Sequence, residues 1–271
     1  MELGLNGQVA LVTGGGQGVG RQICIELAAE GARVVVNDLF AERAQAVAEE
    51  INAAGGKAFA APADITQMEA VDAMVASAAE HFGAPITVLV NNAGIIPERR
   101  EKGGRTPAFV DTPVVDWAKI VNLNVYGTMY CCRAVLPGMV QSKTGRIINI
   151  ISEAGRIGEA NMAVYSGAKA AIAGFAKALA REHGRHAVTV NSIALGAVSH
   201  EGIKDGPLNI HATVENNELL GKMLNAYPIS KGVGRLSRPT DVSGIVAFLA
   251  SDRALFITGQ TIGASGGFAM V

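Results

Sequence analysis

Thr13-Gly14-Gly15-Gly16-Gln17-Gly18-Val19-Gly20 is a glycine-rich stretch between the apolar run Gln8–Thr13 and a helical segment that extends to about Glu30. Glycine has no Cβ, so the backbone can turn tightly here and approach a pyrophosphate closely. The helix that follows presents free N–H groups and the positive end of its dipole to an anion. Because a strand precedes the turn and a helix follows it, we interpret this stretch as a phosphate-binding turn.

The alternation of strand and helix continues along the chain. Short β-branched runs predict strands, and Ala-rich segments with helical periodicity predict helices. Beyond the first unit, the expected strands are Arg33–Asn37, Lys57–Ala61, Thr87–Val90, Arg146–Ile151 and Val188–Ile193, and the expected helices are Ala41–Ala54, Gln67–Phe82, Trp117–Gln141 and Tyr165–His183. Strands that are apolar on both faces indicate an α/β fold with a parallel sheet covered by helices on both sides.

Two segments are expected to be irregular, Ile96–Thr112 and Val198–Lys231, the second with one short helix near Val214–Asn225. Both follow strands and therefore fall at the carboxyl edge of the sheet, where open α/β folds bind ligands. We interpret them as substrate loops. The charged run Glu98–Arg105 could attract an anionic substrate such as an acyl-CoA or a carboxylate, or it could be a solvated loop.

Composition excludes several classes of protein. The 271 residues carry a net charge of −1, which gives no field to attract nucleic acid or an anionic membrane. The N-terminus lacks the pattern of a secretion signal, and no apolar run approaches the roughly 18 to 20 residues of a membrane span, so we expect a cytoplasmic protein. The three cysteines lack metal-finger spacing and are expected to be reduced, and Cys131 and Cys132 are expected to be packing residues. His183 and His186 have no evident third partner, so no metal site is predicted.

An acidic residue, Asp38, stands just past the second expected strand. Its carboxylate can accept hydrogen bonds from the adenosine ribose hydroxyls of NAD and would repel the additional phosphate of NADP. Leu39 follows it and Gln17 occupies the turn, so neither position offers a cation for that phosphate. We therefore expect NAD rather than NADP, the alternative being that Asp38 only caps the helix that begins near Ala41.

Tyr165 and Lys169 lie one helical turn apart on one face of an expected helix. A free tyrosine has a pKa near 10, and a neighbouring ammonium should lower that value and favour the phenolate. Ser152 follows an expected strand, thirteen residues before Tyr165, and its hydroxyl can hold a substrate oxygen as the charge on that oxygen changes. Asn124 lies within an expected helix, an unfavourable place for asparagine unless its side chain is used.

Together these motifs resemble the short-chain dehydrogenase/reductase family over nearly the whole chain. The turn at 13–20 resembles the family's TGxxxGxG, Asn91-Asn92-Ala93-Gly94 resembles its NNAG motif, and residues 191–196 resemble its NxxxPG segment beside the nicotinamide. Asn124, Ser152, Tyr165 and Lys169 match the family's catalytic tetrad in type and spacing.

The resemblance implies a single-domain Rossmann fold over residues 1–271, with a doubly wound, mostly parallel seven-stranded sheet. It implies that Tyr165 transfers the alcohol proton, that Lys169 holds the nicotinamide ribose, that Ser152 orients the substrate oxygen and that Asn124 fixes a water leading from Lys169 to solvent. It assigns to the cofactor Gly14, Gln17, Gly18, Val19, Gly20, Asp38, Leu39, Asp64, Ile65, Asn91, Ala93, Gly94, Tyr165, Lys169, Gly196 and Val198.

Two departures affect the nicotinamide pocket. Leu195 replaces the usual proline before Gly196, which leaves the turn less rigid. His200 stands where the family often has a threonine that contacts the carboxamide, and its imidazole could either replace that hydrogen bond or face solvent.

The expected activity is NAD-dependent interconversion of a secondary alcohol and a ketone. Two alternatives stay open: an enzyme of 3-oxoacyl or 3-hydroxyacyl thioesters within the same family, and a non-catalytic NAD-binding sensor. The resemblance also implies a homotetramer or homodimer, with Trp117–Gln141 and the Tyr165 helix at one interface.

Overall fold

A seven-stranded sheet in the order β3-β2-β1-β4-β5-β6-β7 forms the centre of the computed structural model, which describes residues 3–95 and 107–271. The strands are β1 (Val9–Val12), β2 (Arg33–Val36), β3 (Lys57–Ala60), β4 (Val88–Asn91), β5 (Gly145–Ser152), β6 (Val188–Leu195) and β7 (Thr261–Ala264). Every neighbouring pair runs parallel. The predicted parallel α/β sheet is confirmed.

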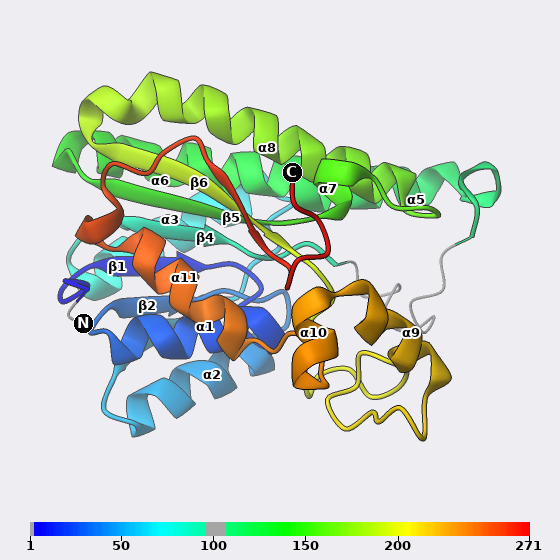
Figure 1. Ribbon diagram of the computed structural model, residues 1–271. Coiled ribbons are helices and arrows are strands. Elements are labelled where there is room, and N and C mark those ends of the chain that lie inside the picture. The colour runs from blue at the N-terminus through cyan, green and yellow to red at the C-terminus, as the bar shows by residue number, and fades with distance from the viewer. Residues whose placement is uncertain (1–2, 96–106) are drawn as a thin grey trace.

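Helices cover both faces of the sheet, as the doubly apolar strands predict (Figure 1). On one face α1 (Gly18–Ala29), α2 (Ala41–Ala53) and α11 (Thr240–Ala250) share an apolar cluster with the strands, and on the other face α3 (Met68–Phe82), α6 (Gly127–Ser142) and α8 (Ala163–His183) do the same. Neighbouring residues of one strand alternate between these cores: Val9 and Leu11 belong to one, and Ala10 and Val12 to the other.

Some elements differ from the sequence-based expectation. The helix expected over Trp117–Gln141 is three successive pieces: α5 (Val114–Val121), a π-helical turn (Asn122–Tyr126) and α6. Within Val198–Lys231 the short helix expected near Val214–Asn225 is present as α9 (Glu218–Ala226), whereas α10 (Pro228–Val233), which starts in the same segment, was not expected. The sequence analysis did not locate α11 or β7. Strand β7 has only four residues and includes a glycine, so its pattern is too short to identify.

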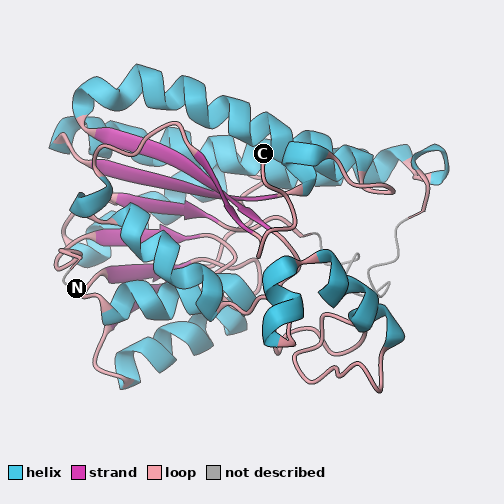
Figure 2. Ribbon diagram, in the orientation of Figure 1, coloured by secondary structure: helices cyan, strands magenta, loops and turns pink. Residues whose placement is uncertain are grey.

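The strands point their carboxyl ends toward α9 and α10, which lie beyond that edge of the sheet (Figure 2). The direction of strand order reverses between β1 and β4, and such a switch point forms the ligand crevice of open α/β sheets. The charged run Glu98–Arg105 lies outside the described residues. Among the helices of the described part, none combines the length and apolarity required to cross a bilayer.

Candidate active site

The glycine-rich turn after β1 depends on missing Cβ atoms. Gly14 and Gly18 have φ of 62° and 55°, the left-handed region that side chains disfavour. A Cβ on Gly20 would lie 2.1 Å from the carbonyl oxygen of Gly14, so the first turn of α1 packs directly on the backbone of the loop. The turn is therefore compact and leads straight into the N-terminus of α1, as an anion-binding turn requires.

The end of β4 is tied to the same turn. Thr13 Oγ1 accepts hydrogen bonds from the N–H groups of Asn92 (3.0 Å) and Ala93 (3.1 Å). The side-chain amide of Asn92 donates to the carbonyl oxygens of Thr13 and Gly14. The two motifs that the sequence placed 78 residues apart thus form one hydrogen-bonded unit at the switch point.

Asn91 contributes differently. It is buried, and its amide donates to Asn149 Oδ1 (2.9 Å) and approaches Cys132 Sγ. Its side chain therefore joins β4 to β5 within the sheet.

Asp38 is fixed beside the glycine-rich turn. It is 6% exposed, its Oδ2 accepts the N–H of Gly16 (3.1 Å), and its Oδ1 accepts the N–H of Phe40 (3.1 Å). The N-cap residue of α2 is Phe40, so Asp38 does not occupy the N-cap position, and its Oδ1 bonds only the N–H of the N-cap residue. A carboxylate has about four acceptor sites, and the two backbone bonds leave capacity for ribose hydroxyls.

Arg43 was not considered in the sequence analysis, although it lies close to Asp38. A Cβ on Gly16 would meet Arg43 Cβ at 2.6 Å and Asp38 Oδ2 at 2.7 Å, and the Arg43 guanidinium lies 4.2 Å from the centre of the Phe40 ring. The sequence places Arg43 in the first turn of the helix that follows Asp38, and this position is the feature that could have predicted its proximity to the carboxylate. A cation therefore stands near the carboxylate that is expected to select the cofactor.

The next predicted cofactor residues lie along the same edge of the sheet. Asp64 Oδ1 accepts both the N–H and the hydroxyl of Thr66, which fixes the carboxylate after β3. Ile65 is 4% exposed and packs where a Cβ on Gly127 would meet it, whereas Leu39 is 53% exposed.

Lys169 is buried at 6% exposure, and its Nζ donates to the carbonyl oxygen of Ile150 at 2.9 Å. The ammonium lies 5.7 Å from the centre of the Tyr165 ring, one turn earlier on α8. Burial lowers the pKa of Lys169 from 10.5 to about 8. The predicted proximity of phenol and ammonium is thus present in the structure.

Asn124 lies in the π-helical turn between α5 and α6 and is 2% exposed. Its amide donates to the carbonyl oxygens of Gly94 (3.1 Å) and Ile120 (3.0 Å). Its Oδ1 is buried and has no hydrogen-bond partner among the described residues. π-Helical turns often occur at functional sites, and this one directs an unsatisfied acceptor inward.

Gly94 allows these groups to converge. A Cβ on Gly94 would lie 2.7 Å from Lys169 Nζ and 2.8 Å from Asn124 Oδ1. The last residue of the NNAG motif therefore faces both side chains, and any larger residue would displace one of them.

Ser152 is the last residue of β5. Its Oγ accepts the N–H of Ala154 (3.2 Å) and donates a long hydrogen bond to the carbonyl oxygen of Leu195 (3.5 Å). The hydroxyl therefore stands at the carboxyl edge of the sheet, between the ends of β5 and β6. Because the bond to Leu195 is long, the hydroxyl can turn its proton from that carbonyl to a substrate oxygen while its oxygen still accepts the Ala154 N–H.

Gly196 and Val198 follow β6 and lead into the segment over the sheet edge, where Val198 bridges to Ser237. His200 lies against the phosphate-binding turn, because a Cβ on Gly18 would be 2.9 Å from its ring. Its Nδ1 accepts the N–H of Gly202 at 3.1 Å, so the neutral ring carries its hydrogen on Nε2. The half-buried imidazole thus lies against the turn, and the carboxamide contact stays a prediction.

The three cysteines are free and buried, which confirms the packing role expected of Cys131 and Cys132. Burial raises the pKa of each thiol, so these residues stay protonated and unreactive.

Comparison with known proteins agrees with this arrangement. The family model of the short chain dehydrogenases matches residues 8–205. The chain belongs to the short-chain dehydrogenase family. It is therefore an oxidoreductase that binds a nicotinamide cofactor.

Individual short-chain dehydrogenases match over nearly their full length. The chain is 38% identical over 265 residues to a hydroxy(phenyl)methylsuccinyl-CoA dehydrogenase subunit of Thauera aromatica, with 98% of both chains covered. It is 38% identical over 270 residues to a 3-oxoacyl-acyl-carrier-protein reductase of Synechocystis, again with 98% of both covered. A crystal structure named for a short-chain alcohol dehydrogenase of Sinorhizobium meliloti 1021 superposes with a TM-score of 0.85 at 30% identity, covering 99% of this chain and 98% of the other.

Proposed function

We propose that the chain is an NAD-dependent oxidoreductase that interconverts a secondary alcohol and a ketone, with Asn124, Ser152, Tyr165 and Lys169 as its catalytic residues. One observation carries the proposal. The Lys169 ammonium and the unsatisfied Asn124 Oδ1 converge on Gly94, while Lys169 also lies beside the Tyr165 ring. Such an arrangement of buried polar groups is costly to stability and is typical of a catalytic site.

The residues present fit a dinucleotide. The turn at Gly14–Gly20 has no space for a Cβ at Gly20, and Asn124 Oδ1 is a buried acceptor that lacks a partner in the described chain. The residues proposed to hold NAD are Gly14, Gln17, Gly18, Val19, Gly20, Asp38, Leu39, Asp64, Ile65, Asn91, Ala93, Gly94, Tyr165, Lys169, Gly196 and Val198. When bound, NAD supplies the hydride acceptor for alcohol oxidation.

The side chains move the proton. During oxidation Tyr165 Oη takes the proton of the substrate hydroxyl, and it returns a proton during reduction. The Lys169 ammonium favours the phenolate form of Tyr165. Ser152 donates to the substrate oxygen, and Asn124 Oδ1 accepts from a water that connects Lys169 to solvent.

The preference for NAD rests on Asp38. Its carboxylate is held by the Gly16 N–H inside the turn, so a second anion at the adenosine ribose would be repelled. Arg43 is the opposing influence, because its Cβ adjoins the same turn. The carboxylate is buried and fixed, and for that reason we expect it to dominate.

A second candidate substrate class is the thioester of a 3-hydroxyacyl or 3-oxoacyl group. The names of both relatives above specify acyl groups carried by CoA or by acyl carrier protein. A panel that contains simple secondary alcohols and 3-hydroxyacyl-CoA esters separates the two classes by their kcat/KM with NAD.

The test of the proposal is Tyr165→Phe. This change removes only the phenolic oxygen, so NADH binding, measured by fluorescence titration, should be retained while turnover falls about 10²- to 10⁴-fold. Tyr130→Phe, the same change on α6 away from Lys169, is the matched control and should keep full turnover. Near-normal turnover in Tyr165→Phe would refute the mechanism.

A different experimental result would favour the alternative of a non-catalytic NAD-binding sensor. A wild-type protein that binds NADH but reduces no NAD with a chemically diverse panel of alcohols and thioesters would favour a non-catalytic NAD-binding role.

A further inference from the structure

The turn after β6 lacks the residue that would make it rigid. Leu195 stands where the family's NxxxPG segment has proline, so no pyrrolidine ring fixes the backbone before Gly196. On its upstream side the turn is anchored, because the carbonyl oxygen of Leu195 accepts the N–H of Glu153 at 3.0 Å. The next two residues, Gly196 and Ala197, require another support.

Tyr227 contacts both of these residues. Its Oη accepts the N–H of Ala197 at 3.2 Å, and a Cβ on Gly196 would lie only 2.6 Å from its Cε1. The ring edge therefore lies against the Gly196 backbone, while the hydroxyl oxygen satisfies the next amide. A single side chain, thirty residues after Ala197, spans the turn.

Tyr227 is itself held firmly. It is 8% exposed, and its ring stacks on Phe268 with centroids 4.7 Å apart and an interplanar angle of 19°. It belongs to an apolar cluster with Leu220 and Leu224 of α9 and with Leu236. The residue also joins the end of α9 to the start of α10.

The phenol of Tyr227 is not equipped to be a second proton-transferring residue. Burial raises its pKa, and the carboxylates of Glu159 and Glu153 raise it further, whereas at Tyr165 the Lys169 ammonium acts in the opposite direction. The Tyr227 hydroxyl instead serves as a neutral acceptor for a backbone N–H.

We propose that Tyr227 is a positioning residue that takes the place of the missing proline, fixing the Gly196–Ala197 turn and coupling it to α9 and α10. The proposal rests on the proposed function only in identifying this turn as part of the cofactor site. Its consequence is that ordering of the α9–α10 segment and ordering of the turn occur together.

The experiment is a double-mutant cycle with Tyr227→Phe, Leu195→Pro and the combined variant. Tyr227→Phe keeps the ring and its stacking on Phe268 but removes the acceptor of the Ala197 N–H. We expect NADH to bind about tenfold more weakly, the loss of one hydrogen bond to a partly buried group. Leu195→Pro should restore most of that loss in the combined variant and have little effect in the wild type.

Hydrogen exchange provides a readout that needs neither cofactor nor turnover. The Ser199 N–H, which donates to the Ser237 carbonyl at 2.8 Å, lies two residues beyond the turn. We expect its exchange in the cofactor-free protein to be about tenfold faster in Tyr227→Phe and to return toward the wild-type rate in the combined variant. Tyr126→Phe, at a half-exposed tyrosine, is the control.

Two results would overturn the inference. One is unchanged Ser199 exchange in Tyr227→Phe. The other is strict additivity, in which Leu195→Pro has the same effect with and without the Tyr227 hydroxyl. If wild-type protein fails to bind NADH, the proposed function is wrong, while the exchange data still decide whether Tyr227 holds the turn.

Discussion

Burial determines the charge of Lys169. The side chain is enclosed between β5 and the Asn124 turn, and its hydrogen bond to the Ile150 carbonyl only partly replaces lost hydration. The pKa of Lys169 therefore falls to about 8, within reach of ordinary assay conditions. A residue whose charge supports proton transfer is thus also one whose burial costs stability.

The stability of the cofactor-free protein should reflect this titration. Between about pH 8 and 10.5 the folded state releases the Lys169 proton before the unfolded chain does, so the unfolding free energy rises with pH. We expect this contribution to grow by about 1 kcal/mol between pH 7.5 and 9, measured by urea denaturation, and to be absent in Lys169→Met.

Comparing the wild type with Lys169→Met removes the opposing effect of the cysteines on the unfolding free energy. Burial raises the pKa of the three cysteines, so above pH 9 their unfolded thiols ionise first and stability falls. That fall is common to the wild type and to Lys169→Met. Lys177→Met, at an exposed lysine of the same helix, should keep the wild-type slope, and equal slopes in all three proteins would contradict the prediction.

Two substitutions of Asp38 separate its effect on cofactor preference from its effect on the structure of the turn. Asp38→Asn retains an oxygen that can accept the Gly16 N–H but removes the negative charge. We expect the ratio of NADP to NAD dissociation constants to fall at least about tenfold, or about 1.4 kcal/mol. Asp38→Ala should also weaken NAD itself, because the Gly16 N–H loses its acceptor. An unchanged ratio in both variants would show that Asp38 does not select the cofactor.

Close packing of α1 on the loop after β1 is a property of these elements rather than of one residue. The helix approaches so closely that its third residue, Gly20, touches the Gly14 carbonyl. Similarly, the π-helical turn at Asn122–Tyr126 interrupts the α-helix, and the side chain of Asn124 within this turn points toward Gly94. In both cases the geometry of an element places the functional group.

Gly20→Ala should separate this packing from helix propensity. A Cβ 2.1 Å from a carbonyl oxygen forces α1 away from the turn, at a cost of about 1–3 kcal/mol in unfolding free energy, with NADH binding lost. Gly244→Ala in α11 meets no atom within 4 Å and should instead stabilise by up to about 1 kcal/mol. Urea denaturation compares the two, and equal effects would refute the close-packing argument.

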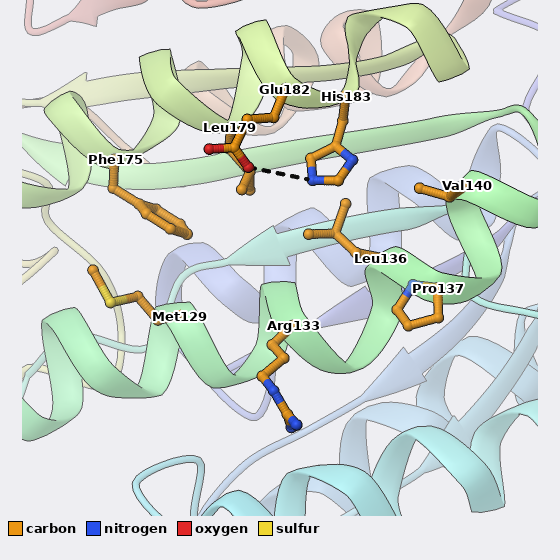
Figure 3. Close-up of a pocket in the computed structure, with 9 residues that line it drawn as sticks. All are labelled: Met129, Arg133, Leu136, Pro137, Val140, Phe175, Leu179, Glu182 and His183. Carbon is orange, nitrogen blue, oxygen red and sulfur yellow. Dashed lines mark ion pairs between the residues drawn. The ribbon is translucent and has the colours of Figure 1, made fainter.

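Across the whole molecule, α6 and α8 leave an open apolar hollow on the outside of the sheet. Figure 3 shows Met129 and Leu136 of α6 facing Phe175 and Leu179 of α8, with the Glu182–His183 ion pair at one end. The helices are those predicted to form a subunit interface. The hollow begins at Phe175, about 15 Å along α8 from Tyr165, so it is separate from the catalytic groups.

We expect the α6–α8 face to pair with a second copy across a two-fold axis. Met129→Glu combined with Leu136→Glu would then place like charges opposite one another, and light scattering should show the mass of the assembly reduced toward that of one chain. Val233→Glu, at an exposed apolar residue of α10, should leave the assembly intact. A wild-type mass equal to one chain would refute the prediction.

The sequence by itself determined the strand–helix alternation and the type and spacing of Asp38, Asn124, Ser152, Tyr165 and Lys169. The alternation follows from β-branched runs and helical periodicity, whereas the significance of these five residues came from their chemistry and spacing and from the resemblance to the family. It did not reveal β7, α11, the π-helical turn or the proximity of Arg43 to Gly16.

Only the tertiary structure decided which distant groups meet. Lys169 and Asn124 converge at Gly94, His200 lies against Gly18, and Tyr227 contacts a turn that is thirty residues away in the sequence. Such contacts depend on the packing of whole helices against a sheet, and no periodicity within a single segment encodes them.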